Sequence, residues 1–131
     1  MTENPLISIV DDDDLSRTAV EKLVRSRGFA TCTFASAELY LQSPFLNKTR
    51  CLIADVQMPN MNGLQLQAHL SLQGLDIPII FLTAYPDEAV KAQALRAGAV
   101  CFLRKGFDIG GERLFDCLRE ALNSGGPASI S

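Results

Sequence analysis

The segment "LISIVDDDDLSR" at residues 6–17 joins a strand-like run to a helix through four consecutive aspartates. Residues 6–10 are mostly apolar, and from Leu15 to Val24 apolar residues recur at the spacing of one helix face. Neighbouring like charges repel, so the acidic turn either is solvated and caps the helix or holds a cation. Negative charge is favourable in the first turn of a helix, which accounts for Asp13 and Asp14. The first pair, Asp11 and Asp12, are candidates for a cation site.

The alternation of strand-like and helical patterns continues along the whole chain. Further strand-like runs lie at 30–34, 51–55, 77–84 and 99–103, and helical patterns lie from about 36, from the glycine at 63 to about 73, at 87–97 and at 114–122. Parallel strands need long, right-handed crossovers, so this order predicts a parallel sheet covered by helices on both faces. We assign residues 1–122 to this α/β/α domain and 123–131 to a linker or tail.

Composition excludes several classes of protein. The 131 residues carry a net charge of −3 without any block of Lys or Arg, which argues against nucleic-acid binding. No apolar stretch approaches the roughly 20 residues of a membrane helix, and the polar start "MTENP" does not resemble a signal peptide. We therefore expect a cytoplasmic protein. The four cysteines lack CxxC spacing and fall in strand-like or helical runs, which predicts reduced, mostly buried thiols.

Reactive residues gather where the predicted strands end. In a sheet of this kind, ligands bind beyond the carboxyl ends of the strands. Asp11 and Asp12 follow the first strand, Asp55 ends the third, Thr83 lies at the end of the fourth, and Lys105 follows the fifth. Neighbouring carboxylates raise one another's pKa unless a positive charge is nearby. The lysine supplies one such charge, and Mg²⁺ suits a site of carboxylates, a main-chain carbonyl and waters.

This set of residues resembles the receiver domain of bacterial two-component response regulators. The matching pieces are "IVDD", "ADVQMPNMNG", "FLTA" and "GAVCFLRK", which occur in the family's order and approximate spacing over residues 6–122. Each of these pieces alone is weak evidence for the family, whereas the four together are specific for it. The resemblance implies a flavodoxin-like, doubly wound, five-stranded parallel sheet of order 2-1-3-4-5 with five helices.

The resemblance also implies roles for the acidic residues. Asp55 corresponds to the phosphoacceptor. Asp12 would bind Mg²⁺ (or Mn²⁺) directly, Asp11 would hold a metal-bound water, and Gln57 would contribute its backbone carbonyl to the metal together with the Asp55 carboxylate. Phosphoryl transfer asks a protein mainly for positioning and for neutralisation of negative charge, which such a site provides.

Further roles follow from the same resemblance. Thr83 and Lys105 would contact phosphoryl oxygens, and Thr83 with Phe102 would form the conformational switch. Gln57 and Tyr85 would flank the path of the water that hydrolyses the phosphorylated state, and so would tune its decay.

The expected partners are those of the family. A sensor histidine kinase would donate the phosphoryl group, and the product would be an aspartyl phosphate. The fourth helix, fifth strand and fifth helix would then change shape and act on a second copy of the domain or on the protein's own output domain. A DNA-binding output, and hence control of transcription, rests on analogy. The domain itself is expected to be a signalling phosphoacceptor and not an enzyme.

Two departures from the family lie near the fifth strand. The family usually has a proline after the lysine, commonly after a cis peptide bond, whereas this chain has Gly106. A cis bond before glycine costs about 2.5–4 kcal/mol, so we expect a trans bond. Gly110 and Gly111 fall where the fifth helix should begin, which predicts a late start.

Two other functions match parts of the pattern. A small Mg²⁺-dependent phosphohydrolase also uses an aspartate nucleophile, but such enzymes usually place it after the first strand and need cap elements for which this chain is short. A receiver-like binding module that works without phosphorylation needs no complete acidic site, yet the acidic pair, Asp55, Thr83 and Lys105 are all present. The phosphorylatable receiver is the preferred interpretation.

Overall fold

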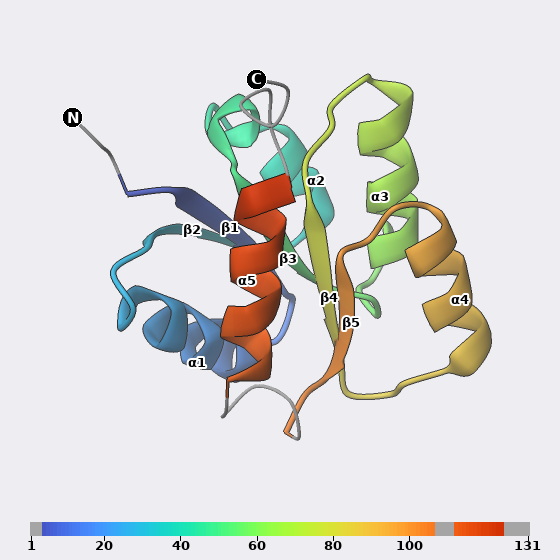
Figure 1. Ribbon diagram of the computed structural model, residues 1–131. Coiled ribbons are helices and arrows are strands. Elements are labelled where there is room, and N and C mark those ends of the chain that lie inside the picture. The colour runs from blue at the N-terminus through green and yellow to red at the C-terminus, as the bar shows by residue number, and fades with distance from the viewer. Residues whose placement is uncertain (1–3, 107–111, 125–131) are drawn as a thin grey trace.

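A computed structural model describes residues 4–106 and 112–124 (Figure 1). The strands are β1 (Leu6–Val10), β2 (Ala30–Phe34), β3 (Cys51–Asp55), β4 (Ile79–Thr83) and β5 (Cys101–Arg104). The helices are α1 (Asp14–Arg25), α2 (Ala37–Leu41), α3 (Gly63–Leu72), α4 (Glu88–Arg96) and α5 (Arg113–Ser124), with a short 3-10 turn at Leu46–Lys48. None of the helices in these ranges is both long enough and apolar enough to cross a membrane.

The strands form one parallel sheet in the order β2-β1-β3-β4-β5, which confirms the predicted fold class. From β1 the chain winds outward to β2 on one side and, through β3, to β4 and β5 on the other. Strand order therefore reverses between β1 and β3. A crevice forms outside the carboxyl ends of the strands at such a reversal; Asp11 directly follows β1 there, and Asp55 is the last residue of β3.

Helices cover both faces of the sheet, with α1 and α5 on one face and α2, α3 and α4 on the other (Figure 1). Alternate residues of each central strand enter opposite cores, as the two-residue period of a strand requires. In β3, Ile53 packs with Leu118 on the α1–α5 side, whereas Leu52 packs with Phe81 on the other. All five residues of β3 are buried, which explains its nearly continuous apolar sequence.

The ends of the elements follow from local chemistry. Asp13 caps α1 by accepting a hydrogen bond from the backbone N–H of Ser16 at 3.2 Å, and Asp14 lies in the first turn, as the acidic run predicted. β4 is shorter than the predicted 77–84 and begins after Pro78, whose nitrogen cannot donate to a neighbouring strand. Gly74, just after α3, has φ +74°, a conformation that glycine adopts without strain.

The prediction of four reduced cysteines was wrong for two of them. Cys101 of β5 and Cys117 of α5 form a disulfide, with Cα atoms 6.2 Å apart. The two lie 16 residues apart, and only the packing of α5 against this face of the sheet brings them together. Cys32 and Cys51 are free thiols, as predicted.

The expectations for the segment after β5 have mixed outcomes. No cis peptide bond occurs among the described residues, so the Lys105–Gly106 bond is trans, as expected. Gly110 and Gly111 lie outside the described residues, and α5 is described from Arg113. That helix reaches Ser124, two residues into the segment assigned from sequence to the tail.

Candidate functional site

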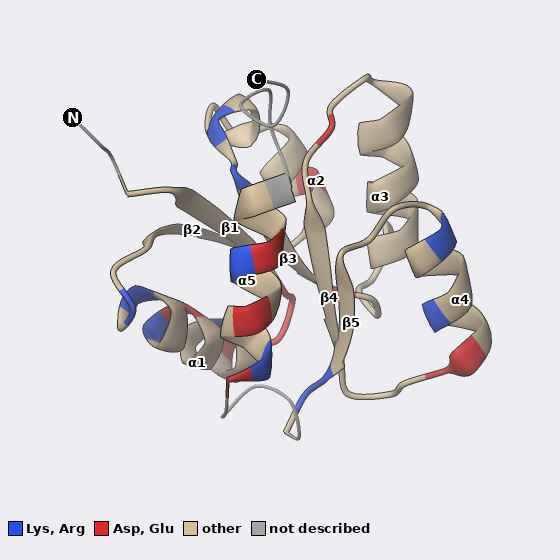
Figure 2. Cartoon of the chain, in the orientation of Figure 1, with Lys and Arg blue, Asp and Glu red and all other residues tan. Residues whose placement is uncertain are grey.

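The carboxyl ends of β1, β3, β4 and β5 surround an open pocket of about 290 Å³, lined by Asp12, Asp13, Asp55, Gln57, Ala84, Tyr85 and Lys105. The loop between β1 and α1 is acidic, whereas the end of β5 is basic (Figure 2). Segments distant in sequence thus bring opposite charges to one edge of the sheet.

Three carboxylates from two strand ends meet in this region. Asp11, Asp12 and Asp55 each offer an oxygen, and these three oxygens lie within 4.8 Å of one another. Asp11 and Asp55 are only 3% and 7% exposed, whereas Asp12 faces solvent. A divalent cation that prefers oxygen ligands fits this donor set, because it would offset the cost of holding carboxylates together.

Lys105 connects the two buried carboxylates. Its Nζ lies 2.8 Å from Asp11 Oδ2 and 3.0 Å from Asp55 Oδ2. Burial raises the pKa of Asp55, and the nearby Lys105 ammonium opposes that increase without cancelling it. Burial also disfavours the charged lysine, but its hydrogen bonds to Asp11 and Asp55 outweigh this effect and raise the pKa of Lys105. The ammonium group therefore stays charged and partly neutralises the site.

Asp11 is held in place by several donors that the sequence reasoning missed. The Ser16 hydroxyl donates to Asp11 Oδ2 at 2.7 Å, and the Asp13 backbone N–H donates to Asp11 Oδ1 at 3.0 Å. Arg17 Nη1 donates to the Asp11 carbonyl oxygen at 2.8 Å. Both side chains lie in the first turn of α1, so the predicted start of that helix was the available signal. Together these bonds orient one carboxylate and leave Asp12 open to the pocket.

Thr83 is fully buried and its hydroxyl is engaged by two neighbours. It donates to Gln57 Oε1 at 2.8 Å and accepts from the Tyr85 backbone N–H at 3.1 Å. Gln57 also donates its own backbone N–H to Asp55 Oδ1 at 3.2 Å. The side-chain contact between Gln57 and Thr83 was not foreseen, because only the side-by-side pairing of β3 and β4 brings these residues together.

The family model of the response regulator receiver domain matches residues 7–118. This chain belongs to that family. It is 40% identical over 117 residues to the response regulator protein TodT of Pseudomonas putida, covering 89% of this chain and 51% of TodT. It is 30% identical over 131 residues to the transcriptional regulatory protein FixJ of Bradyrhizobium diazoefficiens, covering 100% of this chain and 63% of FixJ. The chain thus spans about half the length of TodT.

Solved structures agree with this assignment. The crystal structure of FixJ-N matches with a TM-score of 0.84 at 27% identity, covering 96% of this chain and 99% of that one. The response regulator StyR matches with a TM-score of 0.81 at 35% identity, covering 92% of this chain and 60% of that one. The protein described here therefore contains a receiver domain.

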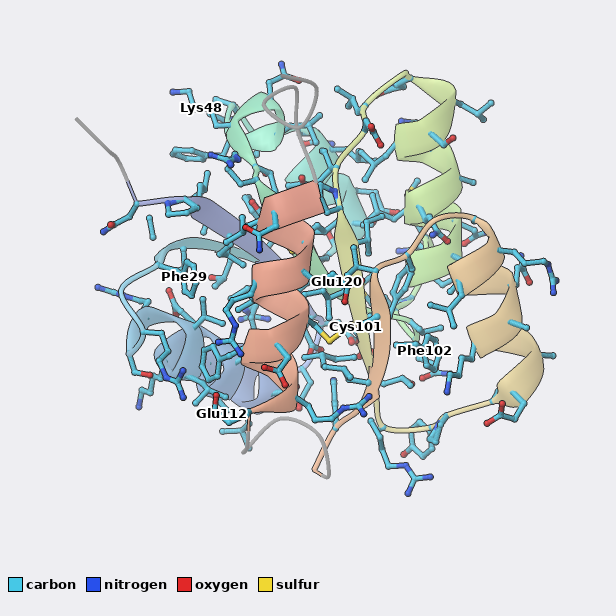
Figure 3. All side chains as sticks on the ribbon, viewed as in Figure 1. Phe29, Lys48, Cys101, Phe102, Glu112 and Glu120 are labelled. Carbon is cyan, nitrogen blue, oxygen red and sulfur yellow. A yellow bond between two sulfur atoms is a disulfide. The ribbon has the colours of Figure 1, made fainter. Side chains whose placement is uncertain are left out.

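Phe102 of this receiver domain lies outside the acidic pocket. It is half-buried in β5, on the side of the sheet that faces α4, with its ring centroid 6.3 Å from that of Phe81. Cys101, the preceding residue, faces α5 instead (Figure 3). The position of Phe102 thus gives its ring a place beside α4, and its role as a switch remains a prediction.

Gly63 packs closely against the end of β3, which carries Asp55. A Cβ atom at this position would lie 2.5 Å from the Asp55 carbonyl oxygen and 2.9 Å from Phe81 Cε1. Its backbone N–H also donates to the Val56 carbonyl at 2.8 Å. The sequence showed this glycine only as a break in a loop, because the approach of α3 to the end of β3 is a tertiary feature.

Proposed function

We propose that this receiver domain accepts a phosphoryl group on Asp55 from a histidine kinase, in a reaction that requires Mg²⁺ or Mn²⁺ and takes place in the cytoplasm. One observation carries the proposal: a buried carboxylate at the end of β3 meets a lysine and two further carboxylates from other elements. Phosphoryl transfer needs this combination of a positioned oxygen nucleophile and nearby positive charge.

The donor set fits the proposed metal. Asp12 and Asp55 would bind the cation directly, Asp11 would hold a metal-bound water, and the Gln57 backbone carbonyl would complete the protein's contribution. When bound, the cation would draw negative charge from the phosphoryl oxygens and orient the group. The Ser16 hydroxyl and the Lys105 ammonium group hold the Asp11 carboxylate in position beside this donor set.

Transfer itself uses the Asp55 carboxylate. One of its oxygens attacks phosphorus in line with the bond to the kinase histidine, that P–N bond breaks, and an aspartyl phosphate forms. Lys105 already contacts Asp55 at 3.0 Å and would pair with a phosphoryl oxygen after transfer. Water later attacks the acyl phosphate, and Gln57 and Tyr85 at the pocket rim would tune the rate of this decay. The domain would thus act as a phosphoacceptor and not as an enzyme on external substrates.

The proposed response begins at Thr83. Its hydroxyl, which now donates to Gln57, would turn to a phosphoryl oxygen, because phosphorylation adds about 1.5–2 negative charges and strong acceptors. Phe102 would move with it, and the surface of α4, β5 and α5 would shift toward a second conformation. The readers would be a second copy of the domain or an output domain that controls transcription, consistent with the similarity to FixJ.

The test is phosphorylation by a small donor. Incubated with acetyl phosphate and Mg²⁺, the wild-type chain should gain one phosphoryl group by intact mass, whereas Asp55→Asn should gain none. Asp76→Asn is the matched control, since Asp76 is an exposed aspartate in the loop before β4. Continuous release of phosphate over many turnovers would favour a phosphohydrolase. No mass change in the wild type would favour a binding module that works without phosphorylation.

A further inference from the structure

A disulfide connects β5 to α5 on the side of the sheet away from Phe102 (Figure 3). Cys117 is 6% exposed and Cys101 is half-buried, and both pack against Leu114 and Leu118 of α5. The bond ties α5 to the strand that carries Phe102, which lies three residues before Lys105. A covalent link at this place restrains movement between β5 and α5, two of the three elements whose surface the proposed switch shifts.

The other two thiols differ from this pair. Cys51 is fully buried, and burial raises its pKa to about 12. Burial and the nearby Glu21 carboxylate raise the pKa of Cys32. Because the thiolate is the reactive form, neither residue suits oxidation, and neither has a cysteine partner within the described ranges. Cys101 and Cys117 therefore differ from the other two cysteines, because among the described residues only they lie close enough to form a disulfide.

We propose that Cys101 and Cys117 form a reversible disulfide that favours the unphosphorylated arrangement and so makes the receiver sensitive to oxidants. This inference rests on the proposed function. In a reducing cytoplasm, disulfides are usually transient and act in redox sensing. In the structure the disulfide occurs together with the hydrogen bond from Thr83 to Gln57 and the ion pair between Lys105 and Asp55, so the cross-link is compatible with this arrangement of the switch residues. A cross-link that fits this arrangement raises the free energy of any other in which β5 moves against α5.

A peroxide would serve as the oxidant. The Cys101 thiolate, the more exposed of the two, attacks one oxygen of hydrogen peroxide; the O–O bond breaks, hydroxide leaves and a sulfenic acid forms. The Cys117 sulfur then attacks that sulfur, the S–O bond breaks and the disulfide forms. Overall two thiols lose two hydrogens and one peroxide becomes two waters. A dithiol reverses the reaction by exchange.

The test compares the oxidised and reduced wild-type chain. Peroxide should remove two hydrogens from the intact mass and give a linked peptide that contains Cys101 and Cys117. Because the bond closes a loop of about 16 residues, the thermal midpoint should rise by about 10 °C. Binding of beryllium trifluoride with Mg²⁺, a mimic of the phosphoryl group, should be about fivefold weaker in the oxidised form by calorimetry.

Two variants control for other effects of peroxide. Cys117→Ala removes the cross-link, so its binding of the mimic should not respond to oxidation. Cys32→Ala keeps the pair and should retain the full response. Equal binding in both redox forms of the wild type, or absence of the linked peptide, would overturn the inference. If neither the oxidised nor the reduced wild-type chain binds beryllium trifluoride, both the proposed function and the redox coupling are refuted. This result differs clearly from equal binding by the two forms, which refutes the coupling alone.

Discussion

Replacing Gly63 by alanine should displace Asp55, the proposed phosphoacceptor, without changing any reactive side chain. The new Cβ would lie 2.5 Å from the Asp55 carbonyl oxygen and 3.0 Å from Val56 Cα. Both obstacles are backbone atoms of a buried strand end, which cannot rotate away as a flexible side chain could. Restoring even a 3.0 Å contact to the oxygen therefore requires that α3 or the Asp55 backbone move by about 0.5 Å.

The expected cost in free energy of unfolding follows from two opposing effects. Overpacking a close contact costs about 1–3 kcal/mol. Because the added Cβ atom meets backbone atoms that cannot move aside easily, we expect a cost near the upper end of this range, about 3 kcal/mol. Alanine lowers the conformational entropy of the unfolded chain relative to glycine, and this effect offsets about 0.5–1 kcal/mol of the overpacking cost. A net loss of about 2 kcal/mol corresponds to a fall of roughly 7 °C in the thermal midpoint of a domain of this size.

Urea unfolding and phosphorylation by acetyl phosphate together test this reasoning. Gly63→Ala should lower the urea midpoint with little change in slope, and at matched folded fraction it should accept phosphate more slowly, because Asp55 is displaced. Gly74→Ala is the control: its φ is +74° with nothing within 4 Å of the added atom, so it should cost about 1 kcal/mol and leave phosphorylation unchanged. If Gly63→Ala is no less stable than the control and is phosphorylated at the wild-type rate, the packing argument is wrong.

Three further changes probe the site and the core. Lys105→Met leaves two buried carboxylates uncompensated and should lower the free energy of unfolding by about 2–3 kcal/mol in Mg²⁺-free buffer, with recovery when Mg²⁺ is added; unaltered urea midpoints would contradict this. Gln57→Ala frees the Thr83 hydroxyl from a bond worth about 1 kcal/mol and should tighten beryllium trifluoride binding roughly fivefold by calorimetry; unchanged affinity would show that this bond does not restrain the switch. The variant Tyr85→Phe keeps Tyr40 as its one tyrosine, so that its ionisation can be followed alone. Burial raises the pKa of Tyr40 to about 12, and the absorbance of tyrosinate should therefore appear near pH 12. Since the unfolded chain releases that proton near pH 10, stability should fall as pH rises between these values, and ionisation of the folded protein near pH 10 would refute the assignment.

Much of the architecture could be predicted because its causes are local. The apolar run at 51–55 has no polar residue before its terminal aspartate, and a strand buried on both faces produces that pattern. The role of Asp13 and Asp14 at the start of α1 was predicted correctly, since a side chain at a helix start acts on backbone groups only three residues away. The boundaries were less certain: β5 begins at Cys101, two residues later than predicted.

The contacts within the site could be predicted only in part. Convergence of Asp11, Asp55 and Lys105 follows from strand order, because parallel strands end at a common edge. The bond from Thr83 to Gln57 depends instead on how far β4 extends beside β3, which no local pattern encodes.

By itself, the sequence determined the alternation of strands and helices, the parallel sheet and the kinds of reactive group at its edge, since hydrophobic period and charge act over a few residues. Tertiary structure decided which of these groups touch. It joined Cys101 to Cys117 where separate thiols were expected, and it pressed Gly63 against the strand that carries Asp55. The physical reason is the same in both cases: close contacts between segments far apart in the chain depend on the relative placement of whole elements, to within a fraction of an ångström, and that placement is set by the packing of the entire core.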